Sequence, residues 1–259
     1  MRLKHALLVI LAGAFASGCL KSTTTIDLKP DGSGTIVQEN AVTAEALAMI
    51  KGFAASQNTK DVPQDLFSQE QALKTAETMG VTFVSGEAIK TASHEGYRAL
   101  YKFDDITKVK FNLQQGTEAV AGGSSPARPP FGFTFTRGAS SSVLTIQMPE
   151  QAPGGFPGMP KGTSEADKAQ ATQAMAMMKM MLKGMFVDVS LALDGRIIKS
   201  NATHVDGSKI TLLQMDFDKM VEDEAAMQKL EGATDLKALA NVPGLKIATD
   251  PKLVIEFGR

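Results

Sequence analysis

The segment Phe186-Val-Asp-Val-Ser-Leu-Ala-Leu193-Asp194-Gly195 predicts the β-sheet on which the rest of this chain packs. Its apolar residues from Val187 to Leu193 occupy every second position, so they share one face of a strand. Asp188, Ser190 and Ala192 share the other face, which we expect to be wet or weakly covered. Asp-Gly suits a type I′ hairpin turn, because both central residues of that turn need positive φ. The strand is therefore expected to turn back at Asp194-Gly195.

Two more Asp-Gly pairs occur at places where strands are expected to reverse. Asp206-Gly207 would close an antiparallel meander of three strands over residues 186–216, and Asp31-Gly32 would close a separate hairpin near the N-terminus. The strands expected around these turns are Thr24 to Lys29, Thr35 to Asn40, Arg196 to Val205 and Lys209 to Asp216.

The remaining apolar patterns add strands and helices. Further strands are expected over Val81 to Lys90, Gly96 to Phe103, Val109 to Leu113, Phe131 to Arg137, Val143 to Met148 and a C-terminal segment with Leu253, Ile255 and Phe257. Helices are expected over Ala44 to Ser56, Leu66 to Met79, Glu165 to Gly184 and Asp218 to Leu230. The predicted fold class is α+β, a mainly antiparallel sheet with hairpins and a three-strand meander, packed with several helices.

The chain begins with the pattern of an export signal. Arg2 and Lys4 precede the apolar run Ala6 to Ala14, and the small residues Ala16-Ser17-Gly18 follow it, as in a secretory signal peptide. The apolar run is much shorter than the roughly 20 residues that a transmembrane helix needs. Residues 1–18 are therefore expected to be removed. Residues 19–259 would form the mature domain, with flexible Gly- and Pro-rich loops near residues 116–130 and 149–163.

Cys19 follows this leader directly and is the only cysteine of the chain. The sequence Ala16-Ser17-Gly18-Cys19 resembles the lipobox of bacterial lipoproteins, although Ala16 stands where the family usually has Leu. The resemblance implies that the Cys19 sulfur receives a diacylglycerol and that the freed amine is acylated. Two or three acyl chains hold a protein on a bilayer almost permanently. The alternative is an ordinary cleavage site at Ala14-Phe15-Ala16.

The partner implied by this resemblance is a lipid bilayer bound through acylated Cys19. Leu20 follows the cysteine, whereas Asp at that position would, by family analogy, favour the inner membrane. The expected location is therefore the cell envelope, with the outer membrane facing the periplasm favoured over the inner membrane.

A methionine-rich segment precedes the opening strand. Six of the chain's 14 methionines lie between Met175 and Met185. On a helix the polar arc would hold Lys168, Thr172, Lys179 and Lys183, and the apolar arc Met175, Met177, Met178, Met180, Met181, Leu182 and Met185. That apolar arc is wider than one sheet face requires, so it would meet a second layer, a ligand, a partner or lipid.

Three interpretations of the methionine face stay open. Methionine packs irregular core gaps, so the segment could be a core helix. It could instead form a pliable groove for an acyl chain or a partner helix, or bind Cu(I) through thioethers. No histidine lies nearby, and we expect no metal and no cofactor. The hypothetical apolar-ligand site comprises Met175, Met178, Met181, Leu182 and Met185.

Catalytic patterns are scarce. Without the leader, two histidines remain, His94 in a turn and His204 at a strand end, and both are expected to be solvated or capping residues. No H-E-x-x-H, G-x-S-x-G, S-x-x-K or P-loop pattern occurs. The formal charge of −1, with both signs interspersed, argues against nucleic-acid binding. We expect that the protein is not an enzyme; the alternative is an envelope hydrolase that uses carboxylates distant in sequence.

The N-terminal quarter has a second resemblance. Cys19, the strand with Thr24-Ile26-Leu28 and the turn Pro30-Asp31-Gly32-Ser33-Gly34 are similar to the layout of LppM-type bacterial lipoproteins, an envelope family associated with lipid binding. Members often carry a C-terminal membrane span, which this sequence lacks. The predicted function is a membrane-anchored envelope lipoprotein that serves as a non-catalytic interaction or apolar-ligand module.

Overall fold

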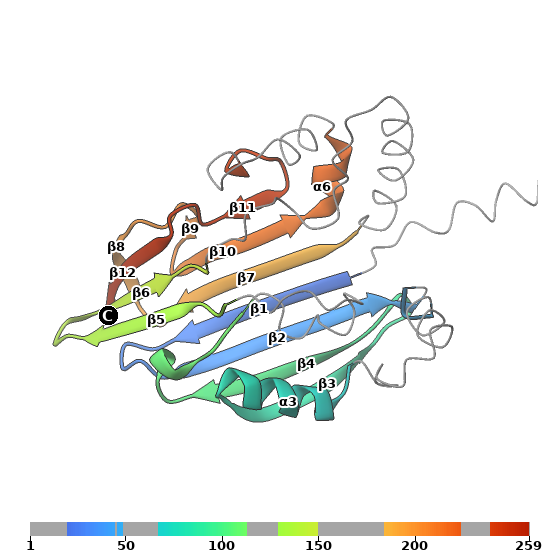
Figure 1. The fold of residues 1–259 in the computed structure, drawn as a ribbon, viewed down its shortest axis with the longest axis horizontal. Coiled ribbons are helices and arrows are strands. Elements are labelled where there is room, and N and C mark those ends of the chain that lie inside the picture. The colour runs from blue at the N-terminus through green and yellow to red at the C-terminus, as the bar shows by residue number, and fades with distance from the viewer. Residues whose placement is uncertain are drawn as a thin grey trace, which may run out of the picture.

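The computed structural model describes residues 20–44, 46–48, 67–112, 129–149, 184–223 and 239–258, and these residues form two β-sheets (Figure 1). The large sheet contains β1 (Leu20–Leu28), β2 (Gly34–Thr43), β3 (Thr82–Lys90), β4 (His94–Phe103), β7 (Phe186–Leu193), β9 (Val205–Asp206), β10 (Lys209–Asp216) and β11 (Leu245–Ile247). The small sheet contains β5 (Gly132–Arg137), β6 (Ser141–Gln147), β8 (Arg196–Ser200) and β12 (Lys252–Gly258). The predicted leader, residues 1–18, lies outside the described residues.

The strand order of the large sheet is β11-β10-β7-β1-β2-β4-β3, with β9 paired to β10. Every described pair in it is antiparallel except β1 and β7, which run parallel. The small sheet has the order β5-β6-β12-β8 and is antiparallel throughout. The predicted mainly antiparallel architecture is confirmed.

The hairpin predicted at Asp31-Gly32 joins β1 to β2. The Gly32 N–H donates to the Lys29 carbonyl over 3.0 Å, and the Lys29 N–H donates to the Ser33 carbonyl over 2.9 Å. Gly32 has φ of +89°, so the loop is a turn that begins with Pro30 and ends in a left-handed glycine. The Asp31 carboxylate accepts hydrogen bonds from the backbone N–H and the hydroxyl of Ser33, which fix the turn.

The meander predicted over residues 186–216 is wrong. β7 pairs with β10 on one side and with β1 on the other, so β8 has no free edge beside β7 and joins β12 in the small sheet. Asp194-Gly195 therefore forms a corner between two sheets. Gly195 has φ of +149°, and an added Cβ would lie 2.7 Å from the Gly258 carbonyl oxygen. The reversal near Asp206-Gly207 is confirmed, because Asp206 pairs with Lys209.

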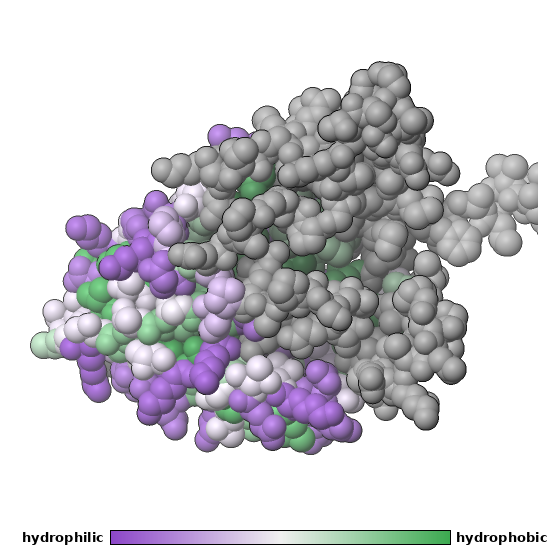
Figure 2. All heavy atoms as spheres, in the orientation of Figure 1, coloured by the Kyte–Doolittle hydropathy of each residue, from purple (hydrophilic) through white to green (hydrophobic). Residues whose placement is uncertain are grey.

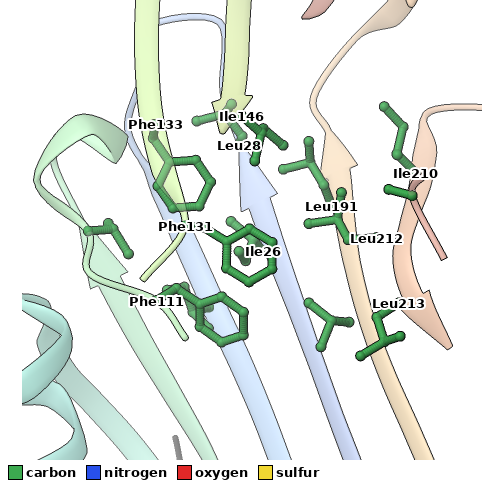
Figure 3. Packing of buried hydrophobic residues seen from close by; sticks show 14 of the residues in the cluster. Ile26, Leu28, Phe111, Phe131, Phe133, Ile146, Leu191, Ile210, Leu212 and Leu213 are labelled. Carbon is green, nitrogen blue, oxygen red and sulfur yellow. The ribbon is translucent and has the colours of Figure 1, made fainter. Parts of the chain in front are cut away.

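The two sheets pack face to face and enclose the core (Figure 3). The labelled side chains of β5 and β6, including Phe133 and Ile146, lie over those of β1 and β7, including Ile26 and Leu191. Phe131 stacks on Phe133 with ring centroids 6.4 Å apart. The predicted inward faces are confirmed for Leu144, Ile146, Leu253, Ile255 and Phe257, which are fully buried, and for Phe131 and Phe133, which are nearly so. Phe135 and Met148 are partly buried against the same core.

The second face of β7 differs from the prediction. Asp188 and Ser190 are buried rather than wet. Asp188 accepts a hydrogen bond from the Gln214 amide over 3.3 Å and lies 3.7 Å from the Lys209 ammonium, while the Ser190 hydroxyl lies 3.3 Å from that of Thr25. Alternation predicted which residues face the core, but it could not show that neighbouring polar side chains cover the other face.

The helix predicted over residues 66–79 is confirmed as α3 (Gln69–Met79). The Ser68 hydroxyl accepts from the Gln71 N–H at its start, and Gly80, with φ of +71°, ends it. α6 (Phe217–Glu222) covers the beginning of the helix predicted over residues 218–230, and the rest of that prediction lies outside the described residues. In the described part, α3 is the one α-helix longer than six residues, so the expectation of several helices is wrong there.

Two other predictions have different outcomes. The strand predicted over residues 109–113 is wrong for 109–112, where the chain follows a 3-10 turn (Ile106–Lys108) and makes single backbone bonds to Met79 and Phe131 instead of a ladder. Within the helix predicted over residues 44–56, residues 44 and 46–48 are helical. The other residues of that prediction lie outside the described part of the chain. The predicted helix over residues 165–184, apart from Gly184, and nearly all of both predicted loops also lie outside.

Asp27 on β1 gives a test of pH dependence. Burial raises the pKa of its carboxyl group, against the hydrogen bond from the Thr35 hydroxyl, which lowers it. A raised pKa means that the folded protein binds the Asp27 proton more tightly than the unfolded chain does. The bound proton therefore stabilises the fold fully below the unfolded-state pKa of about 3.9, and this stabilisation is lost as the pH rises through the folded-state pKa. Asp27→Asn should therefore slightly raise the free energy of unfolding at about pH 7 and have less effect at about pH 3. Urea denaturation at both pH values measures this, and an equal change at both would contradict the sign.

Candidate functional site

Most residues of the hypothetical site lie outside the described ranges. This holds for Cys19 and for Met175, Met178, Met181 and Leu182. Met185 is described. It is partly buried against the core, directly ahead of β7.

The junction at Met185 is held by α6. The Met185 carbonyl accepts a hydrogen bond from the Phe217 N–H over 3.1 Å, and the Gly184 N–H donates to the Asp218 carboxylate over 2.5 Å. Gly184 has φ of +71°, a conformation that suits glycine. The C-terminal end of the methionine-rich segment is thus fixed at the point where β7 enters the large sheet.

The same end of the sheet receives the residue that follows Cys19. β1 starts at Leu20, which pairs with Val42 on β2, and Lys21 pairs with Phe186 on β7. We call this end of the large sheet the anchor end. It is formed by Leu20, Val42, Thr43, His94, Met185, Phe186 and Asp216. Met185 directly precedes β7, the parallel neighbour of β1, so Met185 and the residue after Cys19 lie at the same end of the large sheet. The sequence could not show this.

A polar hollow lies elsewhere, between α3 and the strands β2 and β4. Its volume is about 30 Å³, and it is lined by Gln38, Asn40, Phe67, Ser68, Gln71, Ala72, Thr75, Tyr97, Ala99 and Tyr101. Such a space holds one or two water molecules. It is too small for an acyl chain, so it does not serve as the apolar-ligand site.

The polar lining of this hollow was missed in the sequence. The available signal was the core-facing row of β2, in which Gln38 and Asn40 follow Ile36 at intervals of two. Both side chains are buried, and Asn40 accepts a hydrogen bond from the buried Ser22 hydroxyl over 2.7 Å. Burial also raises the pKa of Tyr101. The core-facing row of β2 thus places the polar Gln38 and Asn40 between the apolar Ile36 and Val42.

The two histidines differ from each other. His94 stabilises the β3–β4 turn. Its backbone N–H donates to the Thr91 hydroxyl over 2.9 Å, and its ring Nδ1 lies 2.9 Å from the Ser93 hydroxyl. His204 is half-buried, and its Nε2 is buried without a hydrogen-bond partner among the described residues. Burial, followed by the positive charge of Lys246, lowers the pKa of His204. His204, expected to be solvated or capping, is therefore only partly exposed to solvent.

Most carboxylates of the described residues are accessible to solvent. Asp188 is the one acid with a buried position in these ranges, and its carboxylate is engaged by Gln214 and Lys209. The described residues contain no group of three His, Cys, Asp or Glu side chains placed to hold a metal ion. Among them, no helix has the length and apolar character to cross a bilayer.

Comparisons with known proteins give one structural likeness. No family model matches the chain, and no curated protein matches it. The folded domain of the LppM protein of Mycobacterium tuberculosis, solved by NMR, is similar, with a TM-score of 0.36 and 9% sequence identity over 93% of this chain and 91% of that one. A likeness at this identity concerns the fold alone.

Proposed function

We propose that this chain is an exported lipoprotein, acylated on Cys19, whose folded domain is a non-catalytic module that binds an apolar ligand or an envelope protein. The observation that carries this proposal is the leader that ends at the only cysteine. The protein would face the periplasm from the outer membrane. It needs no metal or cofactor for this role.

The apolar ligand is suggested by the methionine-rich segment. Its predicted apolar arc exceeds what one sheet face can cover, and methionine adapts to ligands of irregular shape. The described end of that arc, Met185, lies at the anchor end, directly ahead of β7, the strand next to β1. An acylated Cys19 would bring this region close to the acyl chains of the membrane.

Acylation can be tested with a variant that is still exported and cleaved. Cys19→Ser alone removes the cleavage that depends on the lipobox, and any leader left attached would itself retain the protein. The variant should therefore also carry Gly18→Ala, which completes an A-x-A cleavage site. The wild type is expected in the membrane fraction with a diacylglyceryl group on its N-terminal peptide, and the double variant in the aqueous fraction, because all acyl chains are lost. A wild-type N-terminus without lipid, by mass spectrometry, would refute the proposal.

Ligand binding can be tested by native mass spectrometry of the protein extracted in mild detergent. The triple variant Met175→Gln, Met178→Gln and Met181→Gln should carry at least about tenfold less co-purified lipid, since about 1.4 kcal/mol of binding free energy gives that factor. The matched control replaces Lys168, Lys179 and Lys183 of the predicted polar arc with Gln and should retain the lipid. A wild type without lipid, together with a lower Tm of the methionine variant, would assign the segment to the core. Co-purified copper would instead favour the thioether site.

A further inference from the structure

The mature chain has no spacer between its proposed anchor and its folded domain. β1 begins at Leu20, the residue after Cys19, and Leu20 is already paired with Val42. Successive Cα atoms are about 3.8 Å apart, so the anchor residue can lie no farther than that from the sheet. β1 is also an interior strand, flanked by β2 and β7, so the tether would enter the large sheet away from its edges.

The small sheet packs over the part of the large sheet that is farthest from the anchor end (Figure 1). β1 has nine residues and spans about 26 Å from Leu20 to Leu28. Beyond Leu28, the β1–β2 hairpin contacts the small sheet, where the Ser142 hydroxyl donates to the Pro30 carbonyl over 2.7 Å. In Figure 2 the described surface at that distant end mixes hydrophilic and hydrophobic residues, and Ile198 and Val254 of the small sheet are among the exposed apolar side chains.

On the basis of the acylation proposed above, we infer that the anchor end rests on the bilayer surface at headgroup level and that the small sheet points away from the membrane. The headgroup layer of each leaflet is about 5–8 Å thick. A sulfur bonded to diacylglycerol lies near the boundary between headgroups and acyl chains. A tether of one residue therefore places Leu20, and with it the anchor end of the large sheet, close to the headgroup layer.

The chemistry of the anchor end suits a surface of low net charge. Lys21 and Lys90 lie on the β1–β3 side, and Lys21 is 3.6 Å from the Glu39 carboxylate. On the other side, Asp216 is 2.9 Å from the Lys219 ammonium. Among the described residues of this end, both ion pairs join opposite charges, so we assign the orientation to the short covalent tether and not to attraction to anionic lipid.

This orientation has a consequence for the ligand. Met185, directly ahead of β7, would lie near the membrane surface, so an apolar ligand that leaves the bilayer would reach this residue with little exposure to water. The module would then act on lipids or proteins of its own membrane and would not reach across the periplasm.

Two exposed alanines in turns provide matched reporters. Ala92 lies in the β3–β4 turn at the anchor end, and Ala139 lies in the β5–β6 turn of the small sheet. Thioether formation occupies the Cys19 sulfur in the lipidated protein, so Ala92→Cys or Ala139→Cys supplies the only free thiol for a fluorescent label. The full acylated protein is reconstituted in phosphatidylcholine vesicles that contain phosphatidylcholine with a nitroxide on its headgroup. The label at position 92 should be quenched several-fold more than the label at position 139.

A spacer provides the decisive control. Insertion of Gly-Ser-Gly-Ser between Cys19 and Leu20 lengthens the tether by up to about 14 Å. Quenching at position 92 should then fall toward the value at position 139, while acylation and vesicle binding stay unchanged. Equal quenching at both positions in the acylated protein without the spacer, or no effect of the spacer, would overturn the orientation and leave the acylation standing. Protein that carries no lipid and does not bind the vesicles would refute the acylation and the orientation together.

Discussion

A chain that ends at Pro251 is expected not to fold. The truncation removes β12, which lies between β6 and β8 in the small sheet and therefore holds that sheet together. It also removes Leu253, Ile255 and Phe257, whose side chains are fully buried. Loss of one such side chain costs about 2–5 kcal/mol, so three cost about 6–15 kcal/mol. That amount is comparable with the whole stability of a typical domain, about 5–15 kcal/mol.

Circular dichroism, thermal unfolding and limited proteolysis of the truncated protein measure this effect. Two single substitutions in β12 separate core burial from a general effect of the strand. Ile255→Ala should cost about 2–5 kcal/mol. Val254 is the neighbouring residue on the outer face and is 40% exposed, so Val254→Ala should cost less than about 1 kcal/mol. A truncated protein that retains a cooperative transition at the wild-type temperature would show that the small sheet does not depend on β12.

Gly96→Ala is expected to lower the free energy of unfolding by about 3 kcal/mol. Gly96 lies in β4 between β2 and β3, where it pairs with Ala41 and Ile89. A Cβ at this position would overlap the carbonyl oxygen of Asn40 and lie 2.6 Å from the Cα of Ala41. Both contacts are with the backbone of an interior strand, which cannot move away without breaking its ladder.

Gly207→Ala is the matched control for steric overlap. Gly207 has φ of +58° in the turn before β10, and an added Cβ would have no heavy atom within 4 Å. Its cost should come from backbone strain alone, about 1–2 kcal/mol. Urea denaturation of both variants gives the comparison. A smaller loss for Gly96→Ala than for Gly207→Ala would show that β2 and β4 can separate at Gly96 without penalty.

The accurate predictions from sequence concern features set by neighbouring residues. Proline and glycine within one short loop specify the turn between β1 and β2. Alternation along β12 identifies its three buried residues, and Ser68 and Gly80 bound α3 because capping acts within a few residues. At the candidate site, the anchor hypothesis also rests on a linear motif, and it stays a prediction because Cys19 lies outside the described residues.

Other features depended on competition between distant segments. Asp194-Gly195 has the composition of a hairpin turn, yet β10 and β1 occupy both edges of β7, so the chain after Gly195 must enter the other sheet. No local pattern could show that competition. The same holds for the buried Asp188, which depends on Gln214 and Lys209 reaching it from the neighbouring strand.

The sequence alone therefore determined the turn between β1 and β2, the limits of α3 and the inward faces of several strands. The export signal and the lipid attachment at Cys19 stay predictions from sequence. These properties depend on covalent order and on side-chain period, which extend over a few residues. The tertiary structure decided the division into two sheets, the parallel pairing of β1 with β7 and the position of Met185 beside the start of β1. These features depend on which strand edges are still free to pair. That is decided only when all strands of the chain have packed.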